Sequence, residues 1–129
     1  MAFTPDLRAA AHRHLDAANK LFREEAKRGD VAGYLFGIAA ECAVKEIATS
    51  IACARTDEIL YAHFPELRRL LLDRLQGRTA QKLRRLIEHD GFLNQWHVKM
   101  RYAPKDDLKA LPVEDWAKQA AYAVNEMGT

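Results

Sequence analysis

The chain has 129 residues and a net charge of +2 at pH 7, with 49% of its residues hydrophobic and 29% charged. This length predicts a single domain, residues 1–129, that is large enough to fold without a metal or disulfide staple. The composition excludes a disordered or low-complexity chain, and the small net charge indicates no bulk preference for nucleic acid.

Two long helices are predicted in the N-terminal half. Thr4 is expected to cap the first, and apolar residues then recur at steps of three and four. These residues are Leu7, Ala11, Leu15, Ala18, Phe22 and Ala26. Gly29 is expected to end this helix and Asp30 to cap the next, which runs from about Val31 to Ala54. The second helix is apolar nearly all round, so it must be enclosed by neighbouring helices or by a partner chain.

Shorter helices are predicted in the C-terminal half. One runs from Pro65 in its first turn to about Leu75, and Thr79 is expected to cap another. Residues 92–102 alternate in part like a strand, but no second strand is predicted to pair with them, so they are interpreted as helix or irregular turn. A last helix is predicted over Val113–Met127. The expected architecture is an all-α bundle of four to five helices.

The two cysteines, Cys42 and Cys53, are not spaced for a disulfide. In one continuous helix they would lie about 16 Å apart along the axis, whereas a disulfide needs Cα atoms within about 7 Å. Reduced thiols and a cytoplasmic location are therefore expected. The N-terminus lacks the basic and apolar regions of a signal peptide. Glu41, Lys45 and Glu46 interrupt the apolar second helix, which argues against a membrane span.

Positive charge gathers in one window of the sequence. From Arg68 to Arg85 there are seven basic residues and one acid, so this window carries +6 and the remainder of the chain −4. The window is interpreted either as a footprint for a phosphate backbone or as the solvated outer face of two amphipathic helices.

Glu41 and Lys45 are spaced for an ion pair on the most apolar helix of the chain. A charge in those surroundings must be paired or lie at a cleft or interface, so the pair is either a structural strut or a group that positions a ligand. No two of the five histidines lie four residues apart, and no Cys-x-x-Cys accompanies them. Neither a metal ion nor another cofactor is predicted.

A short segment before Pro104 is the strongest candidate for function. It combines two aromatic side chains, an imidazole and two cations: Trp96, His97, Lys99, Arg101 and Tyr102. In an α-helix His97 and Arg101 would share a face, where imidazole and guanidinium can do acid–base work beside a phosphate. Aromatic side chains beside cations can also stack nucleobases. The alternative is that Trp96 and Tyr102 belong to the core and that the cations are only solvated.

The run Ala32–Lys45 reads Ala-Gly-Tyr-Leu-Phe-Gly-Ile-Ala-Ala-Glu-Cys-Ala-Val-Lys. It resembles the central-helix signature of a branch of the HEPN superfamily, named for higher eukaryotes and prokaryotes nucleotide-binding. Trp96 with Arg101-Tyr102 resembles the second motif of that branch. The resemblance implies an up-and-down helical bundle that is commonly a homodimer. Many members are ribonucleases, toxins of toxin–antitoxin pairs, or partners of small nucleotidyltransferases.

One feature of the nuclease members is missing after Arg101. Those members carry an arginine and then, after four to six residues, a histidine. Here residues 102–108, which follow Arg101, contain no histidine. The sequence therefore predicts a domain that binds nucleotide or RNA phosphate without catalysis. Lys99 and Arg101 are expected to contact phosphate, and Trp96 and Tyr102 to stack or to shape the cleft. Glu41 with Lys45 is expected to position these groups.

Two alternatives remain open. A metal-independent ribonuclease toxin would use Arg101 with His97 in reversed order, or Arg84 with His89, which fit the nuclease spacing. A protein-interaction module would instead dock a partner through its apolar second helix.

Overall fold

A computed structural model describes residues 3–24, 28–51, 54–89 and 91–128. Within these ranges the chain is helical and contains no strand, so the predicted all-α class is confirmed. The α-helices are α1 (Leu7–Arg23), α2 (Gly29–Ala48), α3 (Asp57–Tyr61), α4 (Glu66–Arg74), α5 (Gln81–Glu88) and α6 (Val113–Glu126). The 3-10 helices are η2 (Arg78–Ala80), η3 (Val98–Tyr102) and η4 (Lys105–Leu108).

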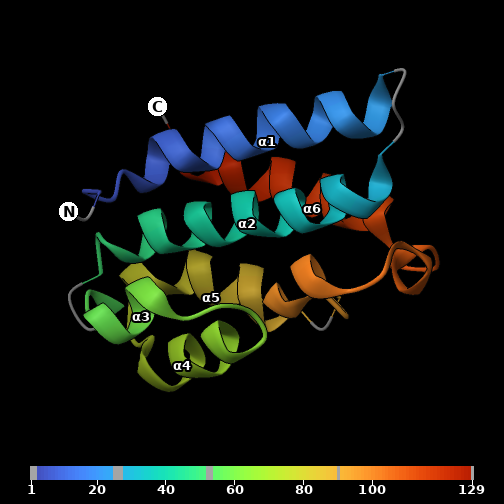
Figure 1. Ribbon diagram of the computed structural model, residues 1–129. Coiled ribbons are helices and arrows are strands. Elements are labelled where there is room, and N and C mark those ends of the chain that lie inside the picture. Colours follow the sequence, from blue (N-terminus) through green and yellow to red (C-terminus); the bar gives the residue numbers. More distant parts are fainter. Residues whose placement is uncertain (1–2, 25–27, 52–53, 90, 129) are drawn as a thin grey trace.

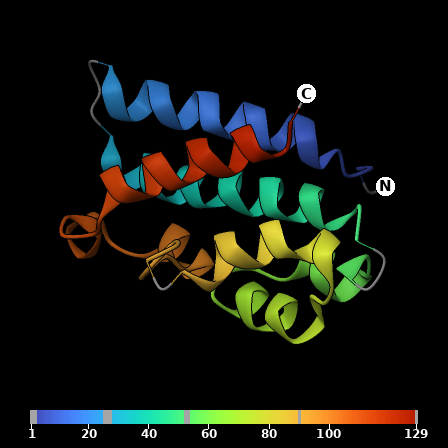
Figure 2. The same ribbon diagram turned by 180° about the vertical axis from the view of Figure 1, so that it is seen from behind.

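Four helices form an up-and-down bundle around α2 (Figure 1). In the order α1, α2, α5 and α6, each runs opposite to the one before it, and α3 and α4 are inserted between α2 and α5 (Figure 2). The helix α2 packs against α1, α5, α6 and η3. The apolar second helix therefore packs against neighbours within the chain over most of its surface, whereas Val31, Leu35, Ile38 and Cys42 along it stay partly exposed.

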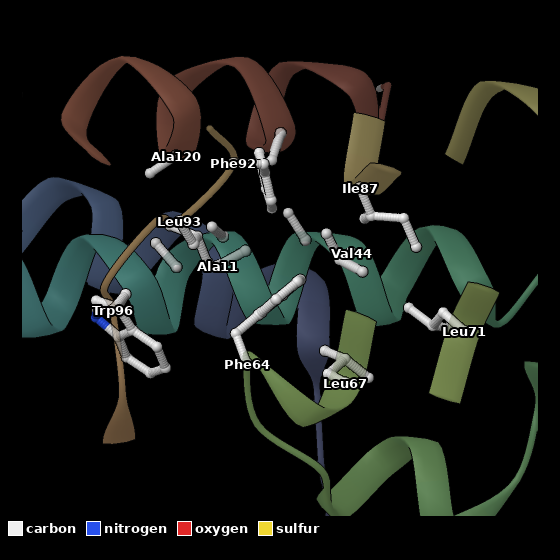
Figure 3. Packing of buried hydrophobic residues seen from close by; sticks show 14 of the residues in the cluster. Ala11, Val44, Phe64, Leu67, Leu71, Ile87, Phe92, Leu93, Trp96 and Ala120 are labelled. Atoms are coloured by element: carbon white, nitrogen blue, oxygen red, sulfur yellow. The ribbon is translucent and has the colours of Figure 1, made fainter. Parts of the chain in front are cut away.

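The core is built from small residues on α2 and large residues around it. Ala32, Ala39, Ala40 and Ala43 are fully buried. Small side chains along one helix let its neighbours approach closely. Bulky side chains from the α3–α4 connection, α4, α5 and the segment after it then close the other side, including Phe64, Leu67, Leu71, Ile87 and Phe92 (Figure 3).

The two glycines of α2 make room for two indole rings. A Cβ atom on Gly37 would lie 2.0 Å from the ring of Trp96, and one on Gly33 would lie 3.1 Å from the ring of Trp116. The indole N–H of Trp96 also donates to the Gly33 carbonyl at 3.2 Å. Trp96 thereby anchors the start of η3 onto α2.

The N-terminal boundaries differ from the sequence-based prediction. Asp6, and not Thr4, caps α1, because its carboxylate accepts from the Ala9 N–H at 3.0 Å. Both residue types are good caps, and the spacing alone does not choose between them. Asp30 does not cap α2 but lies in its first turn, since the helix already begins at Gly29. The expected apolar residue Ala26 lies outside the described residues.

The helix α2 ends at Ala48 and does not continue to the predicted end. The hydroxyls of Thr49 and Ser50 donate to the main-chain carbonyls of Glu46 and Ile47, at 2.6 and 2.8 Å. Such bonds compete with the N–H groups that would extend the helix. The apolar pattern continues past the helix because Ile51 and Ala54 are also buried.

The later boundaries agree in part. The helix α6 begins at Val113, as predicted, whereas Pro65 is the N-cap residue before α4 and not part of its first turn. The prediction for Thr79 was wrong, because this residue lies within η2 and α5 has no side-chain cap. The short helix α3, which Thr56 caps by accepting from the Ile59 N–H, was not predicted.

Cys42 carries a free, half-buried thiol, and burial raises its pKa. Cys53 lies outside the described residues. Across the described part of the chain, no helix is long and apolar enough to cross a membrane.

Candidate functional site

Trp96 belongs to the core and is only 2% exposed. Its ring stacks on Tyr34 of α2, with centroids 5.9 Å apart and an interplanar angle of 16°. With its indole N–H also bonded to α2, it leaves no ring face for a nucleobase. Trp96 therefore shapes the surface above it and does not itself stack a ligand.

Arg101 is held between two tyrosines at the surface of η3. Its Nη1 donates to the Tyr34 hydroxyl at 3.4 Å, and its guanidinium carbon lies 5.0 Å from the centroid of the Tyr102 ring. Hydrogen bonds to Tyr34 and then Tyr102 raise the pKa of Arg101 above its usual value. The side chain is exposed and stays charged at every physiological pH.

The 3-10 geometry of η3 sets which residues share a face. Residues three apart eclipse one another in such a helix, so Lys99 and Tyr102 lie on one side. His97 and Arg101, four apart, do not align as they would in an α-helix. His97 is the N-cap, and its Nδ1 accepts from the Lys99 N–H at 3.1 Å.

Lys99, Arg101, Tyr102 and Tyr34 together form what we call the η3 patch. Neither cation of the patch makes an ion pair with any residue that the structure describes. Tyr102 is 76% exposed, an unusual state for a large aromatic side chain. The patch therefore offers two cations without ion pairs to described residues, beside an exposed tyrosine ring.

The basic window 68–85 is arranged differently, because acids neutralise most of it. With partners among the described residues, four of its cations form ion pairs: Arg69 with Glu66 and Asp73, Arg74 with Glu58, Lys82 with Glu126, and Arg84 with Glu88. Arg68 donates to the Phe92 carbonyl. This supports the interpretation of the window as an outer face of two helices.

Arg84 and His89 make no hydrogen bond to each other and each has other partners among the described residues. Arg84 donates to the Leu72 and Leu75 carbonyls at 3.1 and 3.3 Å, where α4 ends. The His89 ring accepts from the Gly91 N–H at 3.1 Å. A hollow of about 400 Å³ between α2, α5 and α6 is lined by His89 and not by Arg84.

Glu41 is 2% exposed and does not pair with Lys45 as the sequence predicted. Its carboxylate accepts from the Phe64 N–H at 2.6 Å and from Nδ1 of His63 at 2.9 Å. Burial raises the pKa of Glu41, and the hydrogen bond from His63 opposes that shift. The carboxylate thus ties α2 to the segment before α4.

Lys45 lies elsewhere, at a second hollow of about 210 Å³ near α3. It is 7% exposed, and burial lowers its pKa. Tyr34 and Lys45 are eleven residues apart on α2, which is about 16 Å along the axis. The predicted site therefore divides into two regions, with the η3 patch at one end of α2 and Lys45 at the other.

Two participants were not predicted as parts of a site. Tyr34 lies in the predicted apolar second helix and was given no role in a site, yet its ring stacks on Trp96 and its hydroxyl accepts a hydrogen bond from Arg101. His63 was assigned no partner, yet it binds Glu41. The sequence carries no local signal for either contact, because each joins elements that are far apart in the chain.

By its fold, this protein belongs to the class of all-α helical bundles. Among the described residues, no three His, Cys, Asp or Glu side chains gather closely enough to hold a metal ion. Comparisons with protein-family models, with curated proteins and with solved structures found no match.

Proposed function

We propose that this protein binds the phosphate groups of RNA or of nucleotides at the η3 patch, without catalysis. The observation that carries the proposal is Arg101, an exposed cation with two tyrosine partners and no carboxylate partner among the described residues. An arginine held in this way is oriented before the ligand arrives, and less side-chain entropy is lost on binding.

The free cations favour phosphate for an electrostatic reason. Binding of nucleic acid is driven largely by release of the counterions that surround phosphate. A cation that is already paired with a carboxylate must lose that partner first, whereas Lys99 and Arg101 need not. Tyr102 adds a ring on which a base can stack, and each such contact contributes about 1–3 kcal/mol.

The HEPN resemblance of Ala32–Lys45 supports the same class of ligand. It adds two expectations to the proposal, a homodimer and a nucleotidyltransferase-like protein partner of the kind found in toxin–antitoxin pairs. Light scattering of the purified protein tests the first, because a homodimer has twice the mass of the 14.7 kDa chain.

The ribonuclease alternative has less support. His97 caps η3, Arg84 caps α4, and no hydrogen bond joins either arginine–histidine pair among the described residues. Incubation of labelled RNA with the protein in EDTA tests it directly. We expect no cleavage, and cleavage by the wild type that is lost in Arg101→Ala would overturn the non-catalytic part of the proposal.

The binding test is fluorescence anisotropy with a short single-stranded RNA at several salt concentrations. Arg101→Ala should weaken binding about tenfold, or about 1.4 kcal/mol, and lower the salt dependence by about one phosphate contact. Tyr102→Ala should weaken binding with little change in salt dependence.

The matched control is Arg69→Ala, which removes an exposed arginine that already has carboxylate partners. Its RNA affinity should stay within about twofold of the wild type. The proposal is wrong if Lys99→Ala and Arg101→Ala bind RNA and nucleotides as tightly as the wild type.

A further inference from the structure

Lys45 is a largely buried cation that forms no ion pair with a described residue, although the Glu41 charge one turn earlier on α2 attracts it. The residue is only 7% exposed, and no ion pair joins its ammonium to a described carboxylate. Burying a charge that is not in direct contact with its counter-charge is unfavourable, so an anion bound at the ammonium would stabilise the charged form.

The nearest acid on the same helix is already engaged. Glu41 lies one turn earlier, but both of its oxygens accept hydrogen bonds from the segment before α4, one from His63 and one from Phe64. The Lys45 ammonium is left at the hollow of about 210 Å³ between the end of α2 and α3, which we call the Lys45 hollow.

The lining of the Lys45 hollow suits an anion. Arg55 supplies a second cation there, and Thr56 supplies a hydroxyl. The Thr56 oxygen accepts from the Ile59 N–H at 3.3 Å, so its own hydrogen stays available for a ligand. The remaining lining includes apolar side chains such as Leu7 and Leu60, which keep the local dielectric low and strengthen attraction to a bound charge.

The size of the hollow limits the ligand. Pockets for drug-sized molecules begin at roughly 300 Å³, and this hollow of about 210 Å³ is smaller. A single oxyanion group of the size of phosphate fits it, whereas a whole nucleotide does not.

We propose that the Lys45 hollow binds a phosphate group, with Lys45 and Arg55 as the cations and Thr56 as a hydroxyl donor. The phosphate is either a free ion or the terminal group of a phosphomonoester whose remainder stays outside. This site is separate from the η3 patch and lies about 16 Å from it along α2. It does not depend on the proposed function.

Asp57 allows a further test of the proposal, because it is an acid that lines the same hollow. It is exposed, and no ion pair joins it to Lys45 or Arg55 among the described residues. Its negative charge opposes the binding of an anion. Asp57→Asn should therefore bind phosphate more tightly than the wild type.

The experiment is a titration of inorganic phosphate into the purified chain at low ionic strength. Binding is measured by calorimetry and by the ³¹P line width. Arg55→Gln is the first variant, since this exposed side chain can be changed without disturbing the core. Lys45→Met is the second, with circular dichroism to establish that it folds. We expect affinity to fall at least tenfold in Lys45→Met and several-fold in Arg55→Gln.

Two controls separate this site from the rest of the surface. Arg78→Gln removes an exposed arginine outside the hollow, and Arg101→Ala removes the main cation of the η3 patch. Both should bind phosphate in the hollow like the wild type, so failure of the RNA experiment and failure of this one are distinguishable.

A second arm repeats the titration with a nucleoside 5′-monophosphate. Binding that depends on Lys45 identifies the terminal phosphate of an ester as a ligand, and binding of inorganic phosphate alone identifies the free ion. The proposal is overturned if the wild type shows no saturable binding of either. It is also overturned if folded Lys45→Met and Arg55→Gln bind as well as the wild type.

Discussion

The basic window 68–85 and the η3 patch differ in what the fold does with their charges. The window holds seven cations, of which four lie in ion pairs with acids. The η3 patch has only Lys99 and Arg101, and neither has a carboxylate partner among the described residues. Availability for a phosphate ligand therefore follows from the pairing of the cations and not from their number.

The local sequence accounts for much of this difference. In and beside the window, acids such as Glu66, Asp73 and Glu88 lie three or four residues from an arginine on the same helix, the spacing at which side chains meet. From Gly91 to Pro104 there is no acidic residue at all. The neighbours of Arg101 are tyrosines, which orient a cation without neutralising it.

The largest effect is expected from a substitution that displaces Trp96, the side chain that anchors η3 onto α2. Gly37→Ala would place a methyl group 2.0 Å from the buried Trp96 ring. A methyl group at Gly33 would lie 3.1 Å from the Trp116 ring. Overpacking of this kind typically costs about 1–3 kcal/mol, and we expect Gly37→Ala at or above the upper end. Chemical denaturation measures it, and Gly33→Ala is the matched control with a smaller loss.

Gly37→Ala should also weaken RNA binding, because Trp96 would no longer hold the η3 patch in place. The ion pairs of the window 68–85 should remain. Equal stability losses in Gly37→Ala and Gly33→Ala would show that Trp96 is not held as described.

A smaller effect is expected at Lys45, a largely buried cation that forms no ion pair with a described residue. Burial lowers its pKa, so the unfolded chain holds this proton more tightly than the native chain. Stability therefore rises with pH from the lowered pKa of Lys45 up to its ordinary value of 10.5. Lys45→Met should lack this rise and be more stable than the wild type by about 1 kcal/mol at neutral pH without phosphate.

Urea denaturation at a series of pH values measures the difference between the two proteins, in which the titration of other groups cancels. Parallel stability curves for wild type and Lys45→Met across that range would contradict the assignment of a desolvated ammonium.

The smallest effect is expected for the paired cations of the window. Arg69→Gln removes a surface ion pair whose side chains are more than half exposed. Such pairs contribute roughly 0–1 kcal/mol, so thermal unfolding should change little. A loss of RNA affinity as large as that of Arg101→Ala would mean that the window, and not the η3 patch, contacts phosphate.

The helices themselves were largely predictable. Apolar spacing located α1, α2, α4 and α6, because burial of one helix face leaves a period in the local sequence. The end of α2 was missed because Ile51 and Ala54 stay buried after the helix has stopped. The spacing of apolar residues indicates which side chains are buried, but it does not indicate whether the main chain is still helical.

The candidate site was predictable only by residue type. Arg101, Lys99 and Tyr102 were identified from their composition and lie together at the surface. Their helix is 3-10 and not α, so the faces they share differ from those that the sequence spacing suggested.

The sequence by itself determined the all-α class, the central position of α2 and the acid-free segment around Arg101, since each depends on residue type or on local spacing. Only the tertiary structure decided the partners. Glu41 binds His63 and Phe64 from another element, although Lys45 lies one turn away on its own helix. A buried carboxylate is stabilised by whichever donors the packing brings to it, and those donors can lie far away in the chain.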